Sequence, residues 1–319
     1  MSRARLSADK TMPNRCKVWW YAMRPKTLPA AIAPITLGQV LAWVNAPADT
    51  FDVRLMSAIF ACALLLQIAV NFANDVFDFR AGVDGEQRVG PKRAVAQGWL
   101  TASQLFLGLA FVLMLAIAAG SYLIWHGGAV FAWLGVASVV ALLAYSGGPL
   151  PLASNALGEV TVFVFFGLVA VAGGYHLHHE FIPLLVWVSA LQMGCLTAAI
   201  MLVNNLRDLD NDKAASKHTL AVRLGPMRSE GLYRWLLLVP LALQWLVVET
   251  QMPDTQLSLA QRLLSTSLWV LVLFGSVRLS YLIALRKQHA LNQQLAQTAA
   301  LTLLFAIAAS AEWGLRSAV

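Results

Sequence analysis

The chain has 319 residues, of which 59% are hydrophobic and only 12% are charged, and its mean hydropathy is +0.65. A soluble domain usually carries about 25% charged residues, so this composition excludes an ordinary soluble protein. The formal net charge of +7 requires no nucleic-acid partner, because basic residues gather beside membrane-crossing segments and are attracted to anionic lipid.

The apolar residues fall into segments of roughly 17–25 residues, the length that spans a bilayer as a helix. Helices are expected because lipid offers the backbone no hydrogen-bond partners. We therefore predict an all-α integral membrane protein, a bundle of about nine transmembrane helices. The predicted spans are 27–46, 55–74, 103–125, 128–145, 158–175, 181–205, 231–249, 263–285 and 295–315.

The distribution of basic residues predicts how the bundle is oriented, since lysine and arginine favour cytoplasmic loops. Nineteen of the 23 lie on the side that holds the N-terminus: seven before residue 27, four between residues 80 and 93, six between residues 207 and 234, and Arg286 and Lys287. We predict a multi-pass protein of the cell inner (cytoplasmic) membrane, with a cytoplasmic N-terminus and the C-terminus on the opposite side.

The predicted organisation is a basic cytoplasmic segment, residues 1–26, followed by a single transmembrane domain, residues 27–319. The domain divides into a pseudo-repeat, residues 27–145 and 158–285, plus a ninth helix. Cys16 is predicted to be cytoplasmic, whereas Cys62 and Cys195 lie within spans, so no disulfide is expected.

Two polar clusters end the second and sixth predicted spans, at residues 71–78 (followed by Asp84) and 204–212. Carboxylates on membrane helices are costly and by default indicate a functional site. Each cluster contains Asn-x-x-x-Asp, a spacing that puts both side chains on one helix face. Four spans separate the clusters, so their helices run in the same direction and a single shared site is predicted.

The chemistry of the clusters favours a divalent cation. The aligned sets are Asn74 with Asp78, Asn204 with Asp208 and Asp212, and the rotated pair Asn71 with Asp75, while Asp210 is expected to be solvated. Carboxylate and amide oxygens suit Mg²⁺, which commonly shares its shell with substrate phosphates. Basic residues lie in the adjoining loops: Arg80, Arg88, Lys92 and Arg93, and Lys213, Lys217, His218 and Arg223. Acids and bases around one cavity fit a Mg²⁺-diphosphate.

These motifs resemble those of the UbiA superfamily of intramembrane aromatic prenyltransferases, over most of the chain. The matching segments are residues 24–30, 74–79 with Gly82 and Asp84, 90–93, 145–149, 157–160, 204–208 and 219–225. Within the superfamily they are most similar to the branch that acts on 1,4-dihydroxy-2-naphthoate. In that branch Gly82 stands where the wider family has a third aspartate, and Asp84 follows two residues later.

The resemblance implies a bundle whose central cavity opens to the cytoplasmic side and to lipid, with two Mg²⁺ ions. It implies Asn74, Asp78 and Asp84 as ligands of one ion and Asn204, Asp208 and Asp212 as ligands of the other, with Asn71 and Asp75 as further candidates. Lys92, Arg93, Lys217 and Arg223 would contact the diphosphate. The implied reaction joins a polyprenyl diphosphate to 1,4-dihydroxy-2-naphthoate with loss of the carboxyl group, giving a demethylmenaquinone in menaquinone biosynthesis. Another aromatic acceptor, 4-hydroxybenzoate or homogentisate, is the alternative.

Four residues near the clusters have more than one interpretation each. Tyr145 is a candidate catalytic residue whose ring could shield an allylic cation, or a tyrosine of the interfacial aromatic belt. Arg24 and Lys26 could bind the acceptor carboxylate, or serve only as positive flanks of the first span. Glu159 could bind the acceptor or a metal, act as a base, or favour a helix N-terminus.

Two further groups of residues need no catalytic role. His176, His178 and His179, with Glu180, are predicted to form a short polar loop on the side away from the clusters rather than a metal site. Phe163, Phe165 and Phe166 are expected in the core or along the cavity.

Two rival classes fit the sequence less well. A CDP-alcohol phosphotransferase needs an Asp-Gly-x-x-Ala-Arg run, which the chain lacks. A cation-coupled transporter favours midplane sites and often inverted repeats, whereas these polar groups lie at helix ends in a parallel arrangement.

Overall fold

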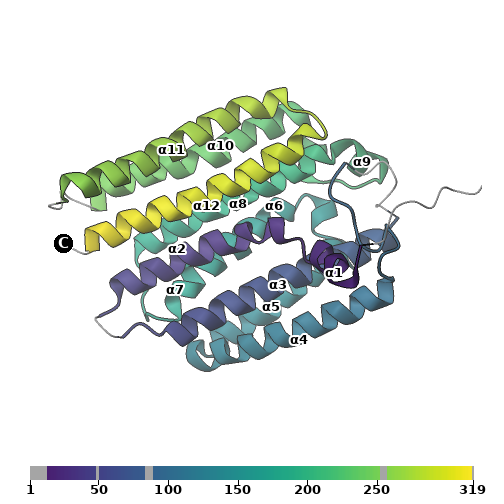
Figure 1. The fold of residues 1–319 in the computed structure, drawn as a ribbon, viewed down its shortest axis with the longest axis horizontal. Coiled ribbons are helices and arrows are strands. Elements are labelled where there is room, and N and C mark those ends of the chain that lie inside the picture. Colours follow the sequence, from purple (N-terminus) through teal and green to yellow (C-terminus); the bar gives the residue numbers. More distant parts are fainter. Residues whose placement is uncertain (1–12, 48–49, 83–88, 252–256, 318–319) are drawn as a thin grey trace, which may run out of the picture.

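A computed structural model describes residues 13–47, 50–82, 89–251 and 257–317, and these residues form a bundle of long helices without strands (Figure 1). The long elements are α2 (Pro29–Asn45), α3 (Val53–Arg80), α4 (Ala102–Gly127), α5 (Ala129–Ser146), α8 (Leu184–Arg207), α10 (Leu220–Gln251), α11 (Leu259–Leu285) and α12 (Ala290–Ser317). The segment between α5 and α8 combines α6 (Gly158–Val162), a π-helix η3 (Phe163–Gly173) and α7 (Gly174–His176). Shorter elements are α1 (Arg15–Met23), η1 (Pro25–Thr27), η2 (Ala153–Asn155) and α9 (Leu209–Ala214).

The predicted all-α membrane bundle is confirmed. Among the described residues, eight helices are long and apolar enough to cross a bilayer, and a ninth span is obtained if α1–η1 and α2 are counted together. Those two parts meet at an angle of 53°. The bend has a local cause, because Arg24 ends α1 in the left-handed conformation (φ 52°) and Pro25 and Pro29 follow it.

The bundle consists of two groups of helices, each with its own apolar core. In one group α1, α3, α4 and α5 pack together around Phe72, Leu105 and Leu109. In the other, α2, η3, α8, α10, α11 and α12 pack around residues such as Met193 and Phe305. Figure 1 shows α3, α4 and α5 side by side, apart from α8, α10, α11 and α12.

Close helix crossings hold η3 in place inside the second group. A Cβ on Gly167 of η3 would lie 2.5 Å from the Cα of Gly194 on α8, and a Cβ on Gly38 of α2 would lie 2.8 Å from the Val171 carbonyl oxygen. Small residues at such crossings let helix backbones approach closely in membrane proteins. The η3 segment is therefore fixed between α2 and α8.

The two polar clusters lie at the same end of the bundle. Helices α3 and α8 run in the same direction, and their C-terminal ends lie beside α1 and α9, whereas the end of α12 lies at the opposite end (Figure 1). Helix α8 stops at Arg207, and Asp208 (φ −93°, ψ 6°) separates it from α9. Helix α10 is also broken, at Gly225 (φ 76°), so its long apolar part begins at Pro226.

Candidate functional site

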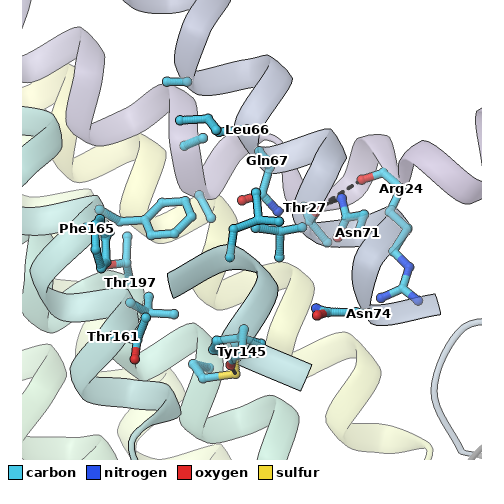
Figure 2. Close-up of a pocket in the computed structure, with 18 of the residues that line it drawn as sticks. Arg24, Thr27, Leu66, Gln67, Asn71, Asn74, Tyr145, Thr161, Phe165 and Thr197 are labelled. Atoms are coloured by element: carbon cyan, nitrogen blue, oxygen red, sulfur yellow. Dashed lines mark hydrogen bonds between the residues drawn. The ribbon is translucent and has the colours of Figure 1, made fainter. Parts of the chain in front are cut away.

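A cavity of about 1850 Å³ lies between the two groups of helices. Its polar end is lined by both Asn/Asp clusters, and its walls continue along α3 as far as Ile59. Because a helix rises 1.5 Å per residue, the 19 steps from Ile59 to Asp78 correspond to about 28 Å. Figure 2 shows the lining residues Gln67, Asn71 and Asn74 of α3 opposite Phe165 and Thr197. The cavity thus joins one polar end to a long apolar interior.

The π-helical segment keeps one of its faces toward this interior. Together with the ends of α6 and α7 that flank it, it contributes two rows of lining residues with a spacing of four: Thr161, Phe165, Val169 and Gly173, and Val162, Phe166, Ala170 and Gly174. In a regular α-helix, residues four apart point in directions that differ by about 40°. Such a row would therefore turn away from the cavity along the helix. The wider turns of the π-helix counter this rotation. Phe163 instead contacts Gly194 on α8. Phe165 and Phe166 therefore line the cavity, whereas the half-buried Phe163 packs against α8.

Asp78 connects the two clusters. Its carboxylate is hydrogen-bonded to the Arg93 guanidinium, and its Oδ1 lies 3.1 Å from Nζ of Lys217, which follows α9. Asp78 is buried although it faces the cavity. One turn earlier, Oδ1 of Asn74 accepts a hydrogen bond of 2.8 Å from the Ser146 hydroxyl. The structure thus brings residues that are 139 positions apart, Asp78 and Lys217, into one charged group.

Arg207 organises the second cluster, a role that the sequence pattern did not reveal. Its Nε and Nη2 donate to the two carboxylate oxygens of Asp208 at 2.9 and 2.5 Å, and Nη2 also donates to Oδ1 of Asn204 at 2.8 Å. Its Nη1 donates to Asn292 at the start of α12. Neighbouring residues within a helix do not face each other; the break at Asp208 makes this side-on pair possible. Asp212, on α9, is buried and lines the same cavity, whereas Asp210 is exposed.

Asp75 and Asn71 both hold neighbouring segments, and of the two only Asn71 lines the cavity. The Asp75 carboxylate, 1% exposed, accepts hydrogen bonds from the backbone N–H groups of Ala94 (2.9 Å) and Val95 (3.3 Å). Asn71 donates to the Met23 carbonyl and the Thr27 hydroxyl. Asp75 therefore fastens the 89–101 loop, which carries Lys92 and Arg93, and Asn71 fastens the turn between α1 and α2.

The remaining candidates for diphosphate and metal binding are placed differently. Lys92 is exposed and lines the cavity, together with Arg93 and Lys217. Arg223 is exposed on α10 and is not among the cavity-lining residues. Asp84 lies outside the described residues.

The candidates for acceptor binding separate into two kinds. Arg24 and Lys26 line the cavity, whereas Glu159 is buried behind it, with Oε1 accepting a hydrogen bond from Asn205 at 2.8 Å. Tyr145 lines the cavity, and its hydroxyl lies 3.1 Å from the Met201 sulfur (Figure 2). Glu159 is thus placed to orient Asn205, and Tyr145 is held inside the bundle.

The comparison with known families decides the class of protein. The profile of the UbiA prenyltransferase family matches residues 31–308. The chain belongs to the UbiA prenyltransferase family. It is a multi-pass membrane protein and an aromatic prenyltransferase.

Relatives and solved structures agree with the UbiA assignment. A 1,4-dihydroxy-2-naphthoate octaprenyltransferase of Haemophilus influenzae is 37% identical over 248 residues, covering 76% of this chain and 80% of the relative. A UbiA homologue from Aeropyrum pernix K1 shares the fold with a TM-score of 0.67 at 14% identity, over 88% of this chain and 96% of that one. A UbiA homologue from Archaeoglobus fulgidus, solved with DMAPP and Mg²⁺, gives a TM-score of 0.63 at 15% identity, over 91% and 97%.

The oxygen donors of this UbiA protein fit a magnesium ion that is shared with a substrate. Asn74, Asp78, Asn204, Asp208 and Asp212 all line the polar end of the cavity, and hard oxygen ligands are those that Mg²⁺ prefers. Within the described part of the chain, no three His, Cys, Asp or Glu side chains come close enough to form a complete metal site by themselves. Mg²⁺ typically keeps waters and takes only one or two protein carboxylates beside substrate phosphates, so the donor set suits binding together with a diphosphate.

The histidine loop, residues 176–179, lies at the other end of the bundle and is held there by polar contacts with α2. His178 is hydrogen-bonded through Nε2 to Gln39 (2.9 Å) and stacks on Phe51, while Nε2 of His179 lies 2.8 Å from the Ala42 carbonyl oxygen. Among the residues that the structure describes, these histidines belong to no group able to hold a metal. Burial lowers the pKa of His178, and repulsion from His179 and His126 lowers it further.

Proposed function

We propose that this protein transfers a polyprenyl group from a polyprenyl diphosphate to 1,4-dihydroxy-2-naphthoate, with loss of carbon dioxide and in the presence of Mg²⁺. The observation that carries the proposal is one cavity. At its polar end both Asn/Asp clusters meet the basic side chains of Arg93, Arg207 and Lys217, and from there a long apolar interior begins. The choice of acceptor is supported by relatives named for 1,4-dihydroxy-2-naphthoate, such as those of Haemophilus influenzae and Escherichia coli, both 37% identical. The direct product is the quinol form of a demethylmenaquinone, which belongs to menaquinone biosynthesis.

The polar end of the cavity binds the diphosphate. Arg93 and Lys217 lie beside Asp78, and the exposed Lys92 reaches the same space from the loop. Guanidinium and ammonium groups donate to phosphate oxygens. We assign Asn74 and Asp78 to one Mg²⁺ and Asn204, Asp208 and Asp212 to a second. When bound, Mg²⁺ neutralises charge that develops on the departing diphosphate.

The apolar interior of the cavity orients the polyprenyl chain of the substrate and excludes water. Phe165, Phe166 and Val169 line it on one side and Ala63 and Leu66 on the other, so a polyprenyl chain fits along it with its first carbon near Asp78. Tyr145 lies at the junction of the polar and apolar parts, where its ring shields the electron-poor carbon from water.

The acceptor ring lies next to the first prenyl carbon, with its carboxylate toward Arg24 and Lys26. The ring carbon that bears the carboxyl group forms the new C–C bond while the C–O bond to the diphosphate breaks. Carbon dioxide then departs, and the electron pair of its bond returns to the ring. Inorganic pyrophosphate is also released. The ring stays at the quinol oxidation level of the acceptor, so no oxidant or reductant is required.

The positive-inside distribution supports an inner-membrane protein whose polar cavity end faces the cytoplasm. In this orientation the water-soluble acceptor and Mg²⁺ reach the site from the cytoplasm, and the prenyl chain remains at membrane depth.

Purified protein in lipid nanodiscs tests the proposal. It is incubated with Mg²⁺, a polyprenyl diphosphate and equimolar 1,4-dihydroxy-2-naphthoate, 4-hydroxybenzoate and homogentisate, and the lipid-soluble products are identified by mass spectrometry. We expect prenylated naphthoquinol with release of carbon dioxide and pyrophosphate, and no product after EDTA treatment. Prenylation of 4-hydroxybenzoate or homogentisate instead would refute the acceptor but leave prenyl transfer. Unchanged turnover in EDTA would refute the magnesium requirement.

A further inference from the structure

The principal candidate metal ligands already have protein partners. Asp78 binds Arg93 and Lys217, and Asn74 accepts from Ser146. In the second cluster one guanidinium, that of Arg207, holds both carboxylate oxygens of Asp208 and the side-chain oxygen of Asn204. The oxygens that suit Mg²⁺ are thus held by the protein's own donors before any substrate binds.

The charges that line the cavity do not require a metal either. The carboxylates of Asp78, Asp208 and Asp212 line it together with the buried or half-buried basic groups of Arg93, Arg207 and Lys217, and further basic residues also line it: Arg24, Lys26 and Lys92. The negative charges are therefore at least matched by positive ones. Repulsion among the acids is therefore relieved without a metal. A divalent cation that enters alone must displace a buried base and adds two positive charges to a site whose acids are already matched, whereas one that enters with a diphosphate brings its own negative charge.

Arg207 is the base best placed to compete with a metal. It is 5% exposed, lines the cavity, and makes a side-on pair with Asp208, the strong two-bond geometry of guanidinium and carboxylate. Its Nη1 also donates to Asn292 Oδ1 (3.2 Å), and Asn292 Nδ2 in turn donates to the Val89 carbonyl oxygen (3.2 Å). This contact links α8 to α12 and to the 89–101 loop.

We infer that Arg207 is a positioning residue that occupies the second metal site in the substrate-free enzyme and yields Asp208 and Asn204 only to a metal that arrives with diphosphate. On exchange, the guanidinium moves from the carboxylate to diphosphate oxygens in the same cavity. The inference rests on the magnesium site of the proposed function. Its consequence is that the substrate-free enzyme has low affinity for the metal alone, and that metal and diphosphate bind cooperatively.

Metal binding, measured without turnover, tests this inference. Mn²⁺ in place of Mg²⁺ is titrated into the purified full chain in nanodiscs, with and without inorganic pyrophosphate, and free Mn²⁺ is followed by electron paramagnetic resonance. We expect the wild type to bind Mn²⁺ at least about tenfold more tightly with pyrophosphate. Arg207→Gln should bind Mn²⁺ alone at least about tenfold more tightly than the wild type, and should lose most of the effect of pyrophosphate.

Two further variants separate the role of Arg207 from general loss of charge. Arg228→Gln removes an exposed arginine of α10 that is not among the cavity-lining residues, and should bind Mn²⁺ like the wild type. Asn292→Ala keeps all charges but removes the outer anchor of Arg207, and should raise affinity for Mn²⁺ alone by a smaller factor. This second variant retains the test if Arg207→Gln does not fold.

The outcomes distinguish the two proposals. Equal Mn²⁺ affinity of Arg207→Gln, Asn292→Ala and the wild type, with pyrophosphate-dependent binding intact, would overturn the role of Arg207 and leave the magnesium site standing. Absence of Mn²⁺ binding in every variant, even with pyrophosphate, would overturn the magnesium site and this inference with it.

Discussion

Asp75→Ala separates an anchoring aspartate from a catalytic one. Asp75 lies three residues before Asp78, yet its oxygens hold the N–H groups of Ala94 and Val95. Hydrogen bonds to a charged group contribute about 1.5–3 kcal/mol each, so removal of both costs about 3–6 kcal/mol of loop attachment. The loop carries Lys92 and Arg93, which we assign to the diphosphate. Because about 1.4 kcal/mol is a factor of ten, the KM for polyprenyl diphosphate should rise at least about tenfold.

The assay compares steady-state kinetics of Asp75→Ala with those of Asp210→Ala in nanodiscs. Asp210 is an exposed carboxylate at the same end of the bundle, so its variant should keep wild-type kinetics. Limited proteolysis should show faster cleavage within the 89–101 loop of Asp75→Ala. An unchanged KM with a collapse in kcat would refute the reasoning, since that pattern indicates a group needed only in the transition state.

Three further predictions concern packing, the tyrosine and pH. Gly167→Ala should lower the thermal stability, measured by fluorescence, by the equivalent of about 1–3 kcal/mol, because the new Cβ lies 2.5 Å from the Cα of Gly194. Gly135→Ala is the control and should not lower it, because its Cβ meets nothing within 4 Å. Equal loss of stability in both variants would contradict the packing of η3. If the face of the Tyr145 ring shields the electron-poor carbon, Tyr145→Phe should retain most of the turnover, and the turnover of Tyr145→Ala should fall at least about tenfold. An equal loss of turnover in both variants would indicate that the hydroxyl, not the ring, is needed. The pKa of His178 is lowered in the fold, so as the pH falls this histidine is protonated in the unfolded chain before it is protonated in the folded protein. The stability should therefore fall as the pH drops below about 6.5. His178→Gln should weaken this pH dependence of thermal unfolding, and an unchanged dependence would exclude His178 as its source.

The bundle could be predicted from sequence because lipid leaves few choices for the backbone. All nine predicted spans correspond to helical segments, and the seventh and ninth extend beyond the predicted ends in α10 and α12. The bend between α1 and α2 and the π-helix η3 were not predicted. Both depend on backbone conformations, at Arg24 and around Gly167, that hydrophobic length does not specify.

The site could be predicted only where helical spacing is decisive. Asn74 and Asp78 lie one turn apart on α3 and both line the cavity, as the spacing of four predicts. Asn204, Asp208 and Asp212 line it too, but not on one helix face, because α8 ends at Arg207 and Asp212 lies on α9. The role of Arg207 was missed because it depends on the helix break at Asp208, and the role of Asp75 because its partners are backbone groups 19 and 20 positions away. Long-range contacts of this kind leave no periodic signal in the sequence.

Turnover of Asp78→Ala and Asp208→Ala most directly tests the claim that the two clusters work as one site. Each variant is assayed with Mg²⁺, a polyprenyl diphosphate and 1,4-dihydroxy-2-naphthoate, after its membrane insertion has been verified. We predict that each substitution lowers kcat/KM at least about a thousandfold, and that the double variant is little worse, because groups acting as a unit are strongly non-additive. Near-normal rates in both single variants would contradict the account.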